Sequence, residues 1–139
     1  MNLSFTVLGR PEPQGSTKAF MPKGWTRPVL TSDNKKLKPW RQDVSGKALE
    51  AMHGKLTTEE AVEVRVRFYF AKPKSTPKRV VEKITKPDVD KLLRGILDSL
   101  TGIVFADDAQ VTGVACEKLF GLPERAEIEV RAKVREVAA

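Results

Sequence analysis

Four aspartates in the second half of the chain have the residue type and spacing for metal-assisted chemistry. Asp88 and Asp90 form a D-x-D pair, and Asp107 and Asp108 are adjacent further along. Clustered carboxylates repel one another unless a cation lies between them, and Mg²⁺ prefers carboxylate, water and phosphate oxygens. Such an ion can activate water and stabilise the negative charge that develops during phosphodiester cleavage. The aspartates therefore predict a metal-dependent hydrolytic site, provided that they lie close together.

An amphipathic helix separates the two pairs. Apolar residues recur with helical period from Val89 to Leu100, Asp88 is at the expected N-cap, and Gly102 ends the pattern. A helix of about 13 residues is roughly 20 Å long, so the two pairs meet only if the chain runs back alongside it. We expect residues 103–105 to do so as a short return strand. Arg94 lies one turn from Asp90, where it can orient that carboxylate or contact a phosphate.

Each of these residues also has a purely structural interpretation. Aspartate is favoured at helix N-caps, in first turns and in tight turns. Asp88 and Asp90 then mark a helix start, Asp107 and Asp108 make a turn, and Asp90 pairs with Arg94 on the surface. The combination of all four aspartates beside a basic segment favours the chemical interpretation.

The periodicity of the remaining chain predicts an α+β domain spanning residues 1–139. Its two main helices pack on one face of a small mixed or largely antiparallel sheet of about four strands, in the order β-α-β-α-β-β. Besides the helix above, the expected elements are a strand around Leu3–Val7, a helix over Leu37–Met52, and strands over Val62–Phe70, Val111–Phe120 and Ala126–Val137. At 139 residues, the chain has the size of one domain.

The net charge of +7 is concentrated in two segments. Residues 10–41 contain eight bases and two acids, and residues 71–87 contain six bases and one acid. Both segments are rich in Pro, Gly, Ser and Thr, so we interpret them as loops whose charge suits a phosphate backbone. Ordinary solvated loops are the alternative, and charge alone does not decide between the two.

The chain has too few cysteine and histidine side chains to build a metal site from thiolate and imidazole ligands. Cys116 is the only cysteine and His53 the only histidine, which excludes an internal disulfide and a thiolate-cluster zinc site. His53 is expected to be a solvated helix-end residue, and Trp25 and Trp40 to be packing residues in preference to base-stacking platforms. The sequence shows no membrane span and no signal peptide, so we expect a cytoplasmic protein without a membrane partner.

Three linked motifs resemble the RusA family of Holliday junction resolvases. They are Lys86-Pro87-Asp88-Val89-Asp90-Lys91-Leu92-Leu93, Leu97-Asp98-Ser99-Leu100-Thr101-Gly102 and Asp107-Asp108-Ala109-Gln110-Val111. Residues 11–16, Trp40-Arg41 and Lys72-Pro73-Lys74-Ser75 are similar to phage and prophage members, so the resemblance covers nearly the whole chain.

The resemblance implies a homodimeric, Mg²⁺-dependent endonuclease, with Mn²⁺ as a substitute ion, that makes paired nicks in four-way DNA junctions during recombination and repair. It implies that Asp88, Asp90 and Asp108 are essential carboxylates and that Asp107 is a lesser ligand. The family places Asn and Lys where this chain has Lys91 and Arg94. Arginine keeps the positive charge but cannot give up a proton. No organic cofactor is expected.

We expect the two basic segments to hold the phosphates of branched DNA. The candidate contacts are Lys18, Lys23, Arg27, Lys72, Lys74, Lys78, Arg79, Lys86 and Lys91. Two symmetric cuts require two sites, which a C2 dimer supplies. The rival hypotheses are a non-catalytic DNA-binding protein, a broader nuclease acting on flaps or forks, and a structural module with acidic caps.

Overall fold

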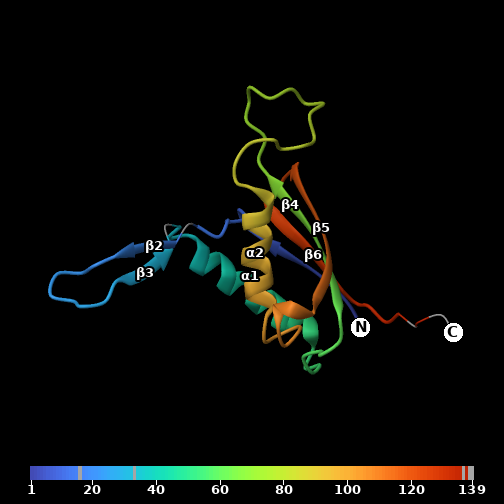
Figure 1. Cartoon of the computed structure of the whole chain (residues 1–139). Coiled ribbons are helices and arrows are strands. Elements are labelled where there is room, and N and C mark those ends of the chain that lie inside the picture. The colour runs from blue at the N-terminus through green and yellow to red at the C-terminus, as the bar shows by residue number, and fades with distance from the viewer. Residues whose placement is uncertain (16, 33, 136, 138–139) are drawn as a thin grey trace.

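The structure is a computed structural model that describes residues 1–15, 17–32, 34–135 and 137, with only the backbone described at 17–20 and 29–32. The described residues form two α-helices, a short 3₁₀ helix and six strands (Figure 1). In chain order these are β1 (Asn2–Leu8), β2 (Thr17–Phe20), β3 (Val29–Ser32), α1 (Leu37–Met52), β4 (Val62–Phe70), α2 (Val89–Leu100), η1 (Asp108–Gln110), β5 (Val111–Phe120) and β6 (Arg125–Ala132).

The main sheet is mixed and has the strand order β1-β6-β4-β5. β6 pairs antiparallel with both β1 and β4, whereas β4 and β5 are parallel. A parallel pair needs a crossover connection, and the segment containing α2 supplies it. α2 therefore lies on the crossover between β4 and β5.

Both helices pack on one face of this sheet, as predicted (Figure 1). The strict alternation of β4 directs every second side chain, from Val62 to Phe70, into the core. α1 buries Trp40, Val44 and Ala48 at spacings of four, and α2 buries Leu92, Ile96 and Leu100 in the same way. The predicted α+β class and the order of the main elements are confirmed.

The first basic segment contains a hairpin that we did not predict. β2 and β3 pair antiparallel over four residues each, and the hairpin projects from the rest of the molecule (Figure 1). Strands this short carry too little alternation to be recognised among prolines, glycines and lysines. The interpretation of residues 10–41 as loop up to the first helix is therefore wrong for these eight residues.

Two further expectations are wrong, one about the path of the chain after α2 and one about the end of the last strand. Residues 102–104 form a turn instead of a return strand: Gly102, at φ +84°, donates its N–H to the Phe105 carbonyl at 2.7 Å. Val104 and Phe105 are buried in the core beyond the C-terminal end of α2, so this segment does not run back along the helix. The last strand ends at Ala132, five residues before the predicted end.

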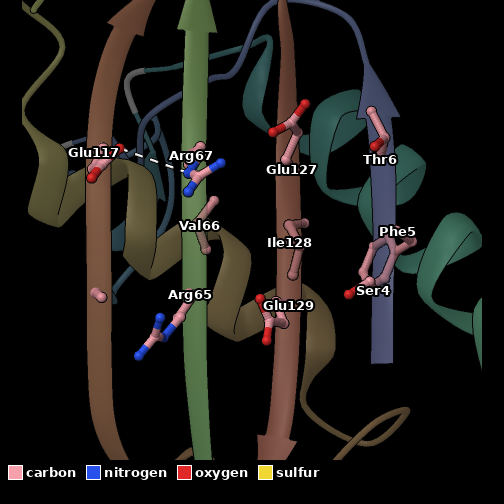
Figure 2. A pocket seen from close by; sticks show the side chains of 11 residues that line it. Ser4, Phe5, Thr6, Arg65, Val66, Arg67, Glu117, Glu127, Ile128 and Glu129 are labelled. Atoms are coloured by element: carbon pink, nitrogen blue, oxygen red, sulfur yellow. Dashed lines mark ion pairs between the residues drawn. The ribbon is translucent and has the colours of Figure 1, made fainter. Parts of the chain in front are cut away.

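The opposite face of the sheet is not covered by any described helix. Arg65, Arg67, Glu117, Glu127 and Glu129 project from it around a shallow recess of about 420 Å³ (Figure 2). Its charges largely neutralise one another: the Arg67 Nε atom is 3.8 Å from a Glu117 carboxylate oxygen. This face therefore lacks the excess positive charge expected of a DNA surface.

Candidate active site

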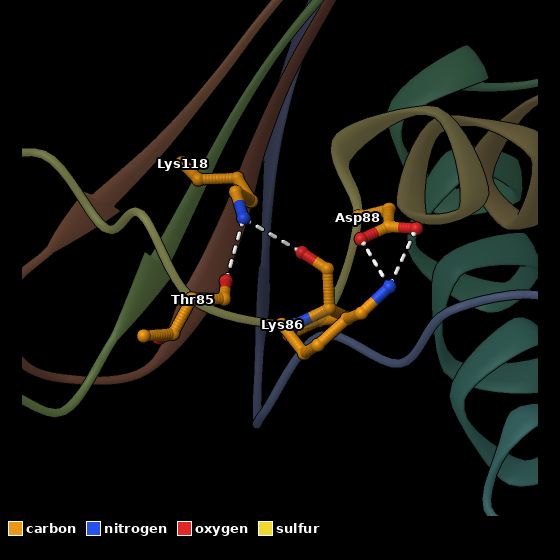
Figure 3. A network of polar contacts seen from close by, with 5 residues as sticks. Thr85, Lys86, Asp88 and Lys118 are labelled. Atoms are coloured by element: carbon orange, nitrogen blue, oxygen red, sulfur yellow. Dashed lines mark hydrogen bonds and ion pairs between the residues drawn. The ribbon is translucent and has the colours of Figure 1, made fainter.

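Asp88 occupies the N-cap position of α2, but its side chain makes no capping hydrogen bond. Both carboxylate oxygens instead accept hydrogen bonds from the Lys86 ammonium, at 2.9 and 3.0 Å (Figure 3). This contact, with smaller contributions from the charges of Lys91 and Lys118, lowers the pKa of Asp88 below 3.8. The side chain is 40% exposed. The carboxylate is thus ionised and accessible, and the capping interpretation does not account for it.

Asp90 and Arg94 follow on the exposed side of the same helix. Among the described residues, neither side chain forms an ion pair or hydrogen bond, so the expected Asp90–Arg94 surface pair is absent. Asp90 lies in the first turn, one turn before Arg94. Both side chains are therefore free to meet a ligand at this end of α2.

The segment that precedes Asp88 is fastened to the end of β5. Two backbone hydrogen bonds join them, from Lys83 N–H to the Lys118 carbonyl at 3.1 Å and from Phe120 N–H to the Val81 carbonyl at 2.8 Å. The Lys118 ammonium adds two more, to the carbonyl oxygens of Thr85 at 2.7 Å and Pro87 at 2.8 Å (Figure 3). Lys118 therefore fixes the backbone immediately before Asp88.

Lys118 is the functional candidate that our sequence reasoning missed. It pairs in register with Phe68, a fully buried residue of β4, so its side chain leaves β5 on the core-facing side of the sheet. A lysine at a core-facing strand position must find polar partners. The alternation that places Lys118 on the core-facing side of β5 is visible in the sequence, although the identity of its hydrogen-bond partners is not.

The second aspartate pair lies beyond the other end of α2. The Asp107 carboxylate accepts a hydrogen bond from Ala109 N–H at 2.9 Å, and Gln110 completes a capping box at the start of η1. Asp107 thus has the structural role that its turn interpretation predicts. Its Ala109 contact lowers the pKa of Asp107, whereas hydrogen bonding to Asp107 and the charges of Asp107 and Asp98 raise the pKa of Asp108.

The structure does not bring the two pairs together within one chain. The 12 residues of α2 span about 18 Å. β5 gives an independent measure, because Val111 next to η1 is seven residues from Lys118, which contacts Pro87, a separation of about 23 Å along the strand. Among the described residues, no three Asp, Glu, His or Cys side chains are placed to hold a metal ion. The expected convergence within a single chain is wrong.

A recess of about 380 Å³ opens beside Asp88. Its lining includes Lys86 and Lys91, together with Gln14 and Asn34 from the two ends of the β2–β3 hairpin. Gln14 donates its backbone N–H to the Lys91 carbonyl at 3.0 Å, which holds the hairpin base against the first turn of α2. The first basic segment is therefore part of the surroundings of Asp88.

The candidate DNA contacts fall into three groups. Lys74, Lys78 and Arg79 are exposed in the loop between β4 and α2, Lys86 and Lys91 flank Asp88, and Lys23 and Arg27 are exposed between β2 and β3. The Lys72 ammonium is bound to the carbonyl oxygens of Pro77 and Lys78 and supports its own loop. The side chain of Lys18 lies outside the described part of the structure.

Exposed carboxylates among basic loops indicate the class of enzymes that act on a phosphate backbone. Residues 9–131 match the family model described as endodeoxyribonuclease RusA, and the chain therefore belongs to the RusA family. It is also 29% identical over 139 residues to the uncharacterized protein YqaN of Bacillus subtilis strain 168, covering 93% of this chain and 95% of that protein.

Family membership makes the chain an endodeoxyribonuclease, which hydrolyses phosphodiester bonds of DNA. The family resolves Holliday junctions, acts on branched DNA and generally depends on a divalent metal. In the part of the chain that the structure describes, no helix has the length and apolar character to span a membrane.

Proposed function

We propose that this chain resolves four-way DNA junctions by paired, Mg²⁺-dependent nicking as a homodimer. The observation that carries the proposal is the state of Asp88: an ionised, accessible carboxylate without a capping partner, at the start of a helix and beside three lysines. The carboxylate oxygens of a purely structural aspartate at this position would be expected to accept hydrogen bonds from the backbone N–H groups of the helix. Asp88 presents them to an ammonium that another cation can displace.

The residues at this end of α2 fit a hard divalent ion. Asp88 and Asp90 offer carboxylate oxygens, and Mg²⁺ commonly binds one or two protein carboxylates and takes its other ligands from water and phosphate. The Lys86 ammonium already bridges both oxygens of Asp88, in the position of a counter-ion. A bound Mg²⁺ would supply an activated water and a charge opposite the reacting phosphate.

The chain's own side chains then have distinct tasks. Asp88 and Asp90 would hold the ion and orient its water, and Lys118 keeps the backbone before Asp88 in place. Arg94 stabilises the additional negative charge on the phosphate as a fixed cation, because a guanidinium does not act as a proton donor at neutral pH. Lys86, released from Asp88, is free to contact a phosphate oxygen.

We further propose that Asp108 of the partner subunit completes each site. Asp108, Asp107 and Asp98 form an acidic group, and within the described residues none of them has an ion-pair partner. If two copies of α2 lie antiparallel across a two-fold axis, the acidic end of one faces the start of the other. The dimer then has two equivalent sites, one for each strand to be cut.

The exposed lysines and arginines bind the junction through its phosphates. Lys74, Lys78 and Arg79 on the loop before α2, with Lys23 and Arg27 on the hairpin, extend the positive surface on both sides of Asp88. Contacts of this kind recognise shape and backbone more than sequence. Junction affinity should therefore fall steeply as salt is raised, and an affinity that is flat in salt would exclude these loops as the DNA surface.

The direct test compares wild type with Asp90→Asn on a synthetic four-way junction and a matched linear duplex, in Mg²⁺ or in EDTA. The substitution is nearly isosteric and removes one negative charge. Paired nicks confined to the junction, dependent on Mg²⁺ and lost in a variant that still folds and binds, are the expected result. Tight binding without cleavage by wild type would identify a DNA-binding protein, and cutting of flaps and forks would identify a broader nuclease.

A further inference from the structure

The tip of the β2–β3 hairpin presents a tryptophan to solvent. Trp25 is 60% exposed, so the expectation that it packs in the core is wrong, whereas Trp40 is 4% exposed and does pack there. The position of Trp25 is built into a turn: its N–H donates to the Pro22 carbonyl at 3.0 Å, and Gly24 adopts φ +84°. A positive φ at the third position of a turn that includes proline is the requirement of a type II turn, which glycine meets without strain.

The side chains around Trp25 are cationic. Lys23 and Arg27 are exposed on either side of it, and Met21 nearby is 54% exposed. An aromatic ring between cations is the combination with which proteins bind unpaired nucleic acid, because the ring stacks on a base while the cations hold the flanking phosphates. A contact with an apolar protein partner would not require these charges.

The hairpin starts at the proposed catalytic end of α2. Gln14 and Asn34, at its base, line the recess beside Asp88, and its strands carry the tip away from the body (Figure 1). β2 alone spans about 14 Å, and Trp25 lies five residues beyond its end. The base-to-tip distance therefore corresponds to more than about four nucleotide steps along a DNA strand. The tip is thus within reach of bases near a phosphate held at Asp88.

We propose that Trp25 stacks on an unstacked base at the branch point of the DNA junction, with Lys23 and Arg27 on the adjacent phosphates. The inference rests on the proposed function, since it assumes that a branched DNA lies at Asp88. A branch point interrupts base stacking and exposes base faces that a continuous duplex does not offer. Trp25 would therefore help the enzyme to distinguish a junction from linear DNA.

The two tryptophans make this proposal measurable in the full-length protein. In an Asp90→Asn background, which keeps the DNA intact in Mg²⁺, tryptophan emission is recorded while a four-way junction or a matched duplex is added. Buried Trp40 supplies a constant background. We expect the junction to quench the Trp25 emission, and the duplex to leave it nearly unchanged.

Substitutions of Trp25 then measure how much its side chain contributes to junction affinity. Trp25→Ala should weaken junction binding by roughly five- to hundredfold, the range for losing one stacked base, while duplex binding and the salt dependence stay unchanged because no charge is removed. Trp25→Phe should retain most of the affinity and abolish the quenching. Leu56→Ala, which removes a side chain that is 90% exposed after α1, is the matched control and should change nothing.

Three results would overturn the inference. Equal affinity of Trp25→Ala and the parent for the junction would show that no base stacks there. A Trp25 emission that depends on protein concentration without DNA would show that a second copy covers the tip. Failure of the parent to bind the junction at all would refute the proposed function together with this inference, and is recognised because the loss precedes any substitution at Trp25.

Discussion

The two ends of α2 carry similar aspartate pairs in opposite electrostatic settings. At the start of the helix, lysines surround Asp88 and lower its pKa, and the backbone before it is fastened to β5. Beyond the end of the helix, the hydrogen bond to Asp107, desolvation and the charges of Asp107 and Asp98 raise the pKa of Asp108, and Asp107 is engaged in a cap. Aspartate is thus an ionised, accessible carboxylate paired with a lysine at one end. At the other end, Asp108 has no ion-pair partner among the described residues.

This difference suggests how a small domain can build a metal site on a single helix. Carboxylates held too close together would destabilise the monomer by repulsion. Separating them by the length of α2 avoids that cost, and in the proposed dimer a bound cation would bring them together only on assembly.

The largest expected effect distinguishes Asp88 from Asp107. Asp88→Asn should reduce junction cleavage by about a thousandfold or more, because it removes a proposed ligand of the ion that drives the reaction. Asp107→Asn should leave cleavage within about tenfold and lower the Tm by a few degrees, since Asp107 caps η1. Single-turnover cleavage rates and thermal melts test both. Equal loss of cleavage in the two variants would break the proposed distinction.

Lys118→Met should reduce the cleavage rate by about ten- to hundredfold at saturating junction, because small misplacements of reacting groups are costly. The junction Kd should change little. Faster hydrogen exchange in residues 83–91 should accompany the loss, and Lys118→Arg, which can reach the same carbonyl oxygens, should restore most of the rate.

Lys55→Met is the control for removing one positive charge, because Lys55 is exposed after α1 and far from Asp88 in the chain. A Lys118→Met enzyme that binds more weakly but cuts at the normal rate would make Lys118 a phosphate contact. A lower Tm with a normal rate and normal exchange would make it a purely structural residue. Either result would refute its positioning role.

The smallest effect concerns protonation. Carbon-13 NMR titration of the carboxyls should give Asp88 a pKa below 3.8 and Asp108 a pKa above 3.8. Lys86→Met should raise the Asp88 value alone. Because the folded pKa of Asp88 is lowered, its contribution to stability is present above pH 3.8 and lost as the pH falls through the folded value. The raised pKa of Asp108 has the opposite sign and disfavours the folded state as the pH rises. Indistinguishable pKa values would remove the electrostatic contrast.

The sequence predicted the elements whose patterns are long and regular. The alternation in β4 and the apolar stripe of α2 each extend over many residues, so local periodicity determined them. The hairpin was missed because β2 and β3 are four residues each. Residue type and spacing, together with the family resemblance, identified Asp88 and Asp90 as candidate site residues.

What the sequence could not predict depends on tertiary geometry. The path after Gly102 was decided by the burial of Val104 and Phe105, which turns the chain into the core before it can return along α2. The Lys118 tether joins residues 31 to 33 positions apart, beyond the reach of local pattern. Trp25 was misjudged because its exposure follows from the unpredicted hairpin.

In the proposed dimer, each active site combines Asp88 and Asp90 of one subunit with Asp108 of the partner subunit. The direct test mixes two inactive proteins, Asp90→Asn and Asp108→Asn, and allows subunit exchange before the junction is added. With shared sites, about half of the dimers are heterodimers in which one site has all its carboxylates intact, so the mixture should regain Mg²⁺-dependent nicking of single strands. If both variants bind the junction and the mixture remains as inactive as each alone, the sites are not shared and Asp108 does not complete the site of the partner subunit.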